Sequence, residues 1–204
     1  MVPDLYEVSD GKLKLNFHPG QYRAWQSKAR FIGVLAGTQG GKTSFGPAWL
    51  WREIQLCGPG DYLVVTPTYP LLALKALPTF LKLFERWLRL GGYTGSPTKK
   101  FTFSEEGARR TFGDRYDPDV ETTIYFGHAT DPDSLESATA KAAWLDEAGQ
   151  KKFRLGSWEA ILRRLSLAQG RALITTTPYD LGWLKQKIWD RWKAGDKDYD
   201  VIRW

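Results

Sequence analysis

The stretch that decides the fold reads AGTQGGKTS and occupies residues 36–44. It follows the apolar run FIGVLA at residues 31–36, which is typical of a buried β-strand, and it leads into a segment from Lys42 to Leu56 that we expect to be helical. Gly46 and Pro47 are expected to tighten or kink the first turns of that helix. Glycines let a backbone wrap closely around phosphates with its N–H groups pointing inward, and a helix N-terminus adds positive partial charge at the same place. The sequence therefore predicts a phosphate-binding loop between a strand and a helix.

This loop has the Walker A pattern, with Ala36 in place of the first glycine. In this pattern the Lys42 amine reaches the β- and γ-phosphates of a nucleotide, and the Thr43 hydroxyl is a ligand of Mg²⁺. The alternative is a glycine-rich turn that binds nothing, and the strand-loop-helix context argues against it. The residues expected to contact the nucleotide are Ala36, Gly37, Thr38, Gln39, Gly40, Gly41, Lys42, Thr43 and Ser44.

A second motif, AAWLDE, occupies residues 142–147, about 100 residues after the loop. It is an apolar strand that ends in two carboxylates, which is the Walker B arrangement. We expect Asp146 to hold Mg²⁺ and Glu147 to act as the general base that polarises the attacking water. Alone, the pair is more typical of a solvated strand end or a helix N-cap, and it gains its weight from the Walker A loop at this separation. Because ligands of open α/β sheets collect at the carboxyl ends of strands, the pair is expected beside the loop.

The two motifs together narrow the reaction and the nucleotide. A glutamate directly after the metal-binding aspartate favours water as the nucleophile, and hence hydrolysis rather than transfer by a P-loop kinase. A GTPase needs an asparagine-containing guanine-reading motif, and the only asparagine, Asn16, is far from any such context. The motifs therefore predict a Mg²⁺-dependent ATPase with Lys42 and Glu147 as its catalytic residues.

Apolar strands alternate with helical segments along the rest of the chain. This pattern predicts an α/β fold of the P-loop NTPase class (ASCE/RecA-like), with a mostly parallel central β-sheet flanked by helices, in a single domain over residues 1–204. Residues 91–119 are rich in turn residues and predict a β-hairpin or an irregular insertion. The expected strands are residues 31–36, 61–66, 121–126, 142–145, 171–176 and 199–204, and the expected helices are residues 42–56, 69–90 with an interruption at Pro78, 158–168 and 181–193.

The composition of the chain constrains its function less than the motifs do. The net charge of +6 is compatible with a nucleic-acid partner but carries little weight alone. Cys57 is the single cysteine, so no internal disulfide is possible and a reducing, intracellular setting is the simplest interpretation. With only His18 and His128 beside it, a structural zinc site is not expected. The sequence shows no signal peptide and no apolar run long enough to span a membrane.

Three further segments carry a family resemblance when they are taken in order with the Walker motifs. They are FHPGQ at residues 17–21, VVTPTY at residues 64–69, and LITTTP at residues 173–178. The combination resembles the ATPase domain of the large terminase subunit of tailed bacteriophages, the motor that packages DNA into capsids. The resemblance extends from about residue 15 to the end of the chain.

The resemblance implies roles for Gln21 and for three threonines. Gln21 stands where these motors read adenine, and a glutamine amide can donate to and accept from the adenine edge at once; a surface glutamine is the alternative. Thr175, Thr176 and Thr177 stand at the motif that couples the γ-phosphate to the DNA-contacting parts. Their alternative is ordinary strand threonine.

The resemblance also implies partners and a setting. ATP hydrolysis would power translocation of double-stranded DNA by a homo-oligomeric ring on a capsid portal, together with the small terminase subunit, in the cytoplasm of an infected bacterial host. DNA would be held through its phosphates. The candidate basic clusters are Lys99-Lys100, Arg109-Arg110 and Lys151-Lys152-Arg154, although each of them taken alone is more typical of a solvated charged surface.

The sequence departs from the family pattern in three places. Thr38 and Gln39 stand where many large terminases have an arginine within the loop, and residues 134–138 (SLESA) lack the Arg-Gly pair that often precedes Walker B. The chain also has no room for the C-terminal nuclease domain, which indicates an excised motor domain or a split subunit. The candidates for a transition-state arginine are Arg109, Arg110, Arg115, Arg154, Arg163 and Arg164, or an arginine of a neighbouring subunit. The competing functions are a helicase-like or remodelling ATPase, and a P-loop kinase or nucleotide-binding module.

Overall fold

The computed structural model describes residues 5–9, 12–130, 139–178, 180 and 182–204. Its strands are β1 (Tyr6–Ser9), β2 (Lys12–Leu15), β3 (Phe31–Leu35), β4 (Asp61–Thr66), β5 (Gly91–Thr94), β6 (Lys100–Phe103), β7 (Thr123–His128), β8 (Ala140–Asp146), β9 (Arg171–Thr176) and β10 (Tyr199–Arg203). Its α-helices are α1 (Pro19–Gln26), α2 (Lys42–Cys57), α3 (Tyr69–Leu71), α4 (Leu77–Leu81), α5 (Glu105–Phe112), α6 (Leu155–Ser166) and α7 (Asp190–Lys193). The remaining helical segments are the π-helical η1 (Leu72–Ala76), η2 (Lys82–Trp87) and η5 (Lys185–Trp189) and the 3-10 turn η3 (Gly113–Arg115).

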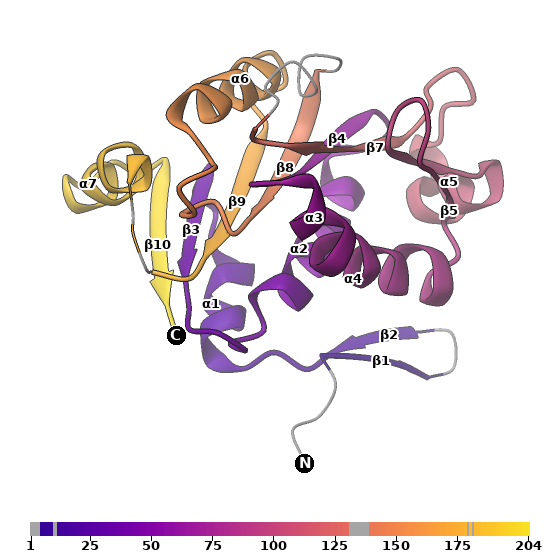
Figure 1. The fold of residues 1–204 in the computed structure, drawn as a ribbon. Coiled ribbons are helices and arrows are strands. Elements are labelled where there is room, and N and C mark those ends of the chain that lie inside the picture. The colour runs from indigo at the N-terminus through magenta and orange to yellow at the C-terminus, as the bar shows by residue number, and fades with distance from the viewer. Residues whose placement is uncertain (1–4, 10–11, 131–138, 179, 181) are drawn as a thin grey trace.

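Eight of these strands form one sheet in the order β10-β3-β9-β8-β4-β7-β6-β5 (Figure 1). The first six run parallel, and β6 and β5 close one edge as an antiparallel hairpin. The prediction of a mostly parallel α/β sheet is therefore confirmed. Because β3, β8 and β9 are adjacent and parallel, the segments that follow them meet at one edge of the sheet.

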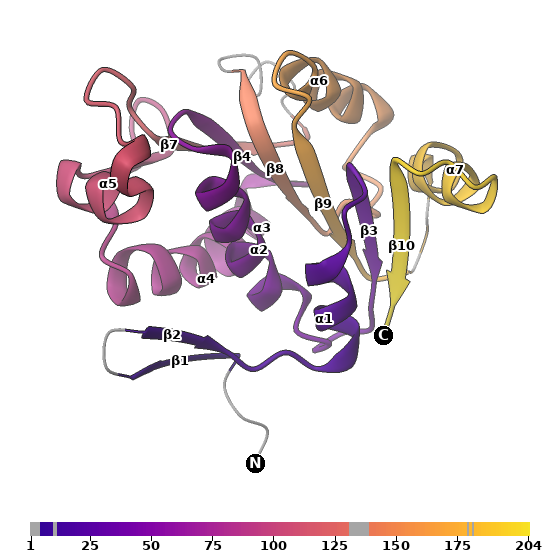
Figure 2. The same ribbon diagram turned by 180° about the vertical axis from the view of Figure 1, so that it is seen from behind.

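Helices cover both faces of the sheet, as Figures 1 and 2 show. Alternate residues of β3 face opposite sides: Ile32 and Val34 join a core with α2 and α4, while Phe31 and Leu35 join a second core with α6 and η5. Fully buried strands read as continuous apolar runs, which is why the sequence pattern located them. In the described part of the chain, no helix has the length and apolar composition needed to cross a bilayer.

The sequence predicted that Pro78 interrupts the helix after β4, but the helical segment from Tyr69 to Trp87 is continuous. Pro78 is the second residue of α4, and wide π-helical turns lie on both sides of that helix. A wider turn moves the preceding carbonyls away from the proline ring, which would otherwise clash in an α-helix. The Lys75 carbonyl accepts a hydrogen bond from the Thr79 hydroxyl at 2.8 Å. The helical segment also ends at Trp87, earlier than the predicted residue 90.

Three elements were not predicted from the sequence: the hairpin β1-β2 and the helices α1 and α5. Residues 91–119 form the hairpin β5-β6, α5 and η3. The helix α5 has a recognisable start, because the Ser104 hydroxyl accepts a hydrogen bond from the Gly107 N–H and Glu105 and Glu106 occupy the first turn. The other boundary differences are small: β7 lies at residues 123–128 rather than 121–126, β8 extends over residues 140–146, and α6 spans residues 155–166.

The helix α2 packs directly on the strand β8 through Gly46. A Cβ atom at this position would lie 2.0 Å from Cε2 of Trp144, which is fully buried. We therefore expect Gly46→Ala to lower the free energy of unfolding by about 3 kcal/mol, measured by urea denaturation. The matched control is Gly156→Ala in α6, where a Cβ meets nothing within 4 Å, and this variant should be as stable as wild type or slightly more stable.

A double-mutant cycle shows whether the Trp144 ring causes the loss. In Gly46→Ala/Trp144→Leu, the smaller leucine side chain makes room for the new methyl group. The losses of stability in the two single variants should therefore add up to more than the loss in the double variant. Additive losses would contradict the proposed clash.

Candidate active site

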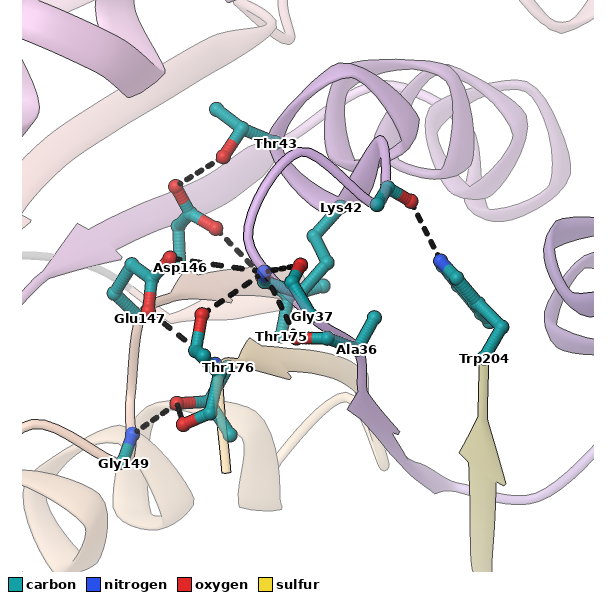
Figure 3. A network of polar contacts seen from close by, with 12 residues as sticks. Ala36, Gly37, Lys42, Thr43, Asp146, Glu147, Gly149, Thr175, Thr176 and Trp204 are labelled. Atoms are coloured by element: carbon teal, nitrogen blue, oxygen red, sulfur yellow. Dashed lines mark hydrogen bonds and ion pairs between the residues drawn. The ribbon is translucent and has the colours of Figure 1, made fainter. Parts of the chain in front are cut away.

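The loop between β3 and α2 closes around the amine of Lys42 (Figure 3). Gly41 precedes the helix with a left-handed φ of 72°, and Gln39 has a φ of 65°. The Lys42 Nζ donates hydrogen bonds to the Ala36 carbonyl at 3.1 Å and to the Gly37 carbonyl at 2.8 Å. The lysine side chain is only 5% exposed, so a cation is held inside the loop.

Asp146 ends β8 and lies beside the start of α2. Its Oδ2 accepts a hydrogen bond from the Thr43 hydroxyl at 3.1 Å, and its Oδ1 accepts one from the Thr175 hydroxyl at 2.7 Å. Burial raises the pKa of this carboxyl to about 6, the charge of Glu147 adds to the rise, and the two hydroxyl donors oppose it. The structure therefore brings together Thr43 and Asp146, the two predicted metal ligands.

Glu147 follows with a backbone that non-glycine residues rarely adopt, at a φ of 54°. Its Oε1 lies 3.9 Å from the Lys42 Nζ, and its Oε2 accepts a hydrogen bond from the Thr177 N–H at 3.4 Å. Strained backbone of this kind collects at functional sites, where the surrounding contacts hold it in place. The two residues predicted to be catalytic thus face each other as a largely buried ion pair.

Thr175 and Thr176, the last two residues of β9, and Thr177, the next residue, make three different contacts. Thr175 holds Asp146 and also accepts a hydrogen bond from the Trp144 indole N–H at 3.3 Å. The Thr176 hydroxyl accepts a hydrogen bond from the Gly149 N–H at 3.0 Å, just after Walker B. The Thr177 hydroxyl accepts one from the Lys42 Nζ at 3.0 Å. The Thr175 and Thr177 hydroxyls therefore contact the Walker aspartate and lysine, and the Thr176 hydroxyl contacts the turn after Walker B. Ordinary strand threonines would not require these contacts.

Gln21 lies against the loop rather than on the surface, with only 3% of it exposed. It completes a capping box at the start of α1, where its Oε1 accepts a hydrogen bond from the His18 N–H at 3.2 Å. Its Nε2 donates to the Gly41 carbonyl at 3.4 Å. One N–H and one acceptor position of the amide are not used by these two contacts.

A cleft of about 760 Å³ opens beside this glutamine and the outer side of the loop. Its volume is in the range of small-molecule sites. Five of the residues predicted to contact the nucleotide line this cleft: Gln21, Gln39, Gly40, Gly41 and Ser44. Thr38, which was also predicted, is exposed and is not part of the lining. The lining also includes Leu5, Asn16, Phe17, His18 and Trp204.

Two residues that contact the loop and the start of α2 were missed by the sequence analysis. Trp204 follows the edge strand β10 and donates a hydrogen bond from its indole to the Gly40 carbonyl. Tyr6, in the N-terminal hairpin, donates from its hydroxyl to the Ser44 carbonyl. Neither lies in a motif, so only the three-dimensional arrangement could have shown them.

The arginine candidates fall in two groups. The first group lies in α5 and η3. Arg109 binds the Glu105 carboxylate, and Arg110 binds the carbonyls of Leu88 and Arg89. Arg115 binds the carbonyls of Gln55 and Leu56. Arg154 is the N-cap residue of α6, whose last turn carries Arg163 and Arg164. The departure noted at residues 134–138 lies outside the described residues.

The buried lysine, the threonine–aspartate pair and the glutamate lie at the carboxyl ends of β3 and β8, two parallel strands on either side of β9. They define the protein class as a P-loop NTPase fold with both Walker motifs in place. No family model matches the chain. Over 80 residues it is 39% identical to the large terminase subunit of Thermus phage G20c, a match that covers 39% of this chain and 16% of that relative.

Solved structures extend the likeness to most of the chain. The large terminase ATPase domain of Thermus phage P74-26 superposes with a TM-score of 0.65 at 23% identity, covering 84% of this chain and 69% of that one. The large terminase of another thermophilic bacteriophage, in complex with ADP, has a TM-score of 0.68 at 14% identity over 93% of this chain and 45% of that one. The predicted resemblance is confirmed: this chain has the fold of a phage large terminase ATPase domain.

Proposed function

We propose that this chain is a single-domain ATPase motor of the large terminase type, which hydrolyses ATP to move double-stranded DNA into a viral capsid. The observation that carries the proposal is the buried meeting of Lys42 with Glu147, next to the Thr43–Asp146 pair. The similarity to terminases of Thermus phages and to an ADP-bound terminase supports the same activity.

The donor set at Thr43 and Asp146 suits Mg²⁺, because one hydroxyl and one carboxylate leave most of the coordination to phosphate oxygens and water. When bound, the metal would supply positive charge that neutralises the charge developing on the phosphate in the transition state. Thr175 would keep the Asp146 carboxylate turned toward this position through its 2.7 Å hydrogen bond.

Glu147 would take up a proton from the attacking water, and the hydrogen bond from the Thr177 N–H would hold one of its oxygens in position. Lys42 now binds two loop carbonyls and the Thr177 hydroxyl. Exchange of some of these contacts for β- and γ-phosphate oxygens would release Thr177. Thr177 thereby links the γ-phosphate to the end of β9, which supports the coupling role proposed for Thr175, Thr176 and Thr177.

Gln21 is proposed to recognise adenine from the cleft beside the loop, because its amide retains one donor and one acceptor position. The proposed setting is a homo-oligomeric ring on the portal of a capsid, assembled with double-stranded DNA and the small terminase subunit in the cytoplasm of an infected bacterium. A nuclease activity would come from a domain outside residues 1–204, and a neighbouring subunit would donate the transition-state arginine that no motif of this chain identifies.

The test is ATP hydrolysis by the wild-type protein over a wide range of protein concentrations, with Mg-ATP binding recorded on the same samples. We expect turnover per molecule to rise with concentration, because an arginine supplied in trans is worth roughly 10³-fold or more in rate. Binding without hydrolysis at every concentration would favour the alternative of a nucleotide-binding module. If Mg-ATP does not bind, the active-site assignment is wrong.

DNA separates the motor from the kinase alternative. Double-stranded DNA should bind at low salt without sequence preference, and its affinity should fall steeply as salt rises. Two basic clusters would be substituted in this test. One is Lys99-Lys100, at the start of β6, and the other is Lys151-Lys152, which follows Walker B. The helicase-like alternative predicts instead a preference for single strands or forks.

A further inference from the structure

Trp204 connects three parts of the nucleotide site that are distant in the sequence. The indole follows β10, at the edge of the sheet next to β3. Its Nε1 donates a hydrogen bond to the Gly40 carbonyl at 2.5 Å (Figure 3). Its backbone N–H donates to the Leu35 carbonyl at 3.3 Å, directly before the loop. The tryptophan thus holds both the entry and the middle of the phosphate-binding loop.

The same indole packs against the start of α1, which carries Gln21. Its ring meets the His18 ring edge to face, with 4.9 Å between the centroids. Gly20 approaches so closely that a Cβ there would lie 2.6 Å from Cε3 of Trp204. His18 itself caps α1 through hydrogen bonds from the Gly20 and Gln21 N–H groups. Trp204 is therefore wedged between the helix that carries the adenine motif and the loop.

Trp204 also lines two clefts beside the loop. One is the 760 Å³ cleft that includes Gln21, Gly40 and Gly41. The other has a volume of about 540 Å³ and includes Gly37, Pro178 and Arg203. A half-buried tryptophan with its only polar side-chain atom bound to the loop is not explained by packing alone.

We propose that Trp204 is a positioning residue for the nucleotide phosphates, acting through Gly40, an inference that rests on the proposed function. A loop carbonyl held by the indole keeps the neighbouring N–H groups in their phosphate-binding arrangement before the ligand arrives. Binding then does not have to order the loop, and the affinity is higher for that reason. Gly40 needs this support because glycine has more backbone freedom than any other residue.

The test compares Mg-ADP with Mg-pyrophosphate, which has the same number of phosphates but no nucleoside. Trp204→Phe keeps a ring against His18 and removes the N–H donor. We expect it to weaken both ligands by the same factor, roughly 2- to 10-fold in Kd, which is the range of a single hydrogen bond. Trp192→Phe, the same change in α7, should alter neither affinity.

A second variant reaches the same contact from the other side. Gly20→Ala leaves the indole intact but pushes it away from Gly40, and it should lower both affinities in parallel. Thermal unfolding of each variant shows whether the folded population is unchanged.

The outcomes separate this inference from the proposed function. Unchanged affinities in Trp204→Phe, or a loss for Mg-ADP alone, would overturn the positioning role, because the loop would then be independent of the indole. If the wild-type protein binds neither ligand, the proposed nucleotide site is wrong, and the inference is overturned with it.

Discussion

In Glu147→Gln, ATP turnover falls by roughly 10²- to 10⁴-fold while Mg-ATP binding is retained, as expected for the loss of a general base. An amide has the size of the carboxylate, and its oxygen can still accept the hydrogen bond from the Thr177 N–H. It cannot take up a proton from water. Steady-state hydrolysis and equilibrium binding of Mg-ATP, measured on the same preparation, check the two halves of this expectation.

The matched control is Glu105→Gln in α5, an exposed glutamate paired with Arg109, and its turnover should equal that of wild type. Undiminished turnover in Glu147→Gln would show that another group activates the water. A combined loss of binding and turnover would instead assign Glu147 to the placement of Lys42, whose Nζ lies 3.9 Å away.

The Walker segments could be predicted from the sequence because local chemistry determines them. Glycines, a lysine and a threonine between a buried strand and a helix leave few other arrangements, and the parallel strands of one sheet have their carboxyl ends at the same edge. The meeting of Lys42 with Glu147 and of Thr43 with Asp146 follows from these two rules. Gln21 required the family resemblance, since a single glutamine has no local signal.

Other features could not be predicted because they depend on contacts between distant segments. Trp204 reaches Gly40 only because β10 pairs with β3, and the sequence pattern does not fix which strands are neighbours. The continuity of the helical segment around Pro78 depends on π-helical turns, for which no sequence rule was available. The helix α5 was a different case, because Ser104 followed by two glutamates is a recognisable N-terminus within a segment rich in turn residues.

Below the active site, a buried ion pair ties the helix α2 to the strand β9. The Arg171 guanidinium donates to the Glu53 carboxylate at 2.6 Å and to the carbonyls of Ala29 and Ser27 at 3.1 and 2.7 Å. Glu53 is only 1% exposed. Because α2 begins with Lys42 and β9 ends with Thr176, the pair holds together the two elements whose ends build the site.

Arg171→Ala should therefore lower the free energy of unfolding by roughly 3–5 kcal/mol, because it leaves a buried carboxylate without its main partner. Urea denaturation measures the loss. The matched control is Arg191→Ala, which breaks an exposed pair with Asp196 and should leave the stability close to that of wild type. If both variants lose equally little, Glu53 is stabilised mainly by its other neighbour, Arg52.

The loss in Arg171→Ala should also depend on pH, in a direction that burial fixes. Burial already raises the pKa of Glu53, and Arg171 and Arg52 oppose the rise, so removing Arg171 raises that pKa further above the unfolded value of about 4.3. As pH increases through this interval, the unfolded chain releases its proton before the folded one, and the folded state loses stability. The variant should therefore be closest to wild type near the unfolded pKa and furthest from it at neutral pH. The double variant Glu53→Gln/Arg171→Ala has no carboxyl at this position, so it should lose this pH dependence and recover part of the stability. If Arg171→Ala instead loses the same stability at both pH values, the missing hydrogen bonds to Ala29 and Ser27 dominate the effect, rather than the buried charge.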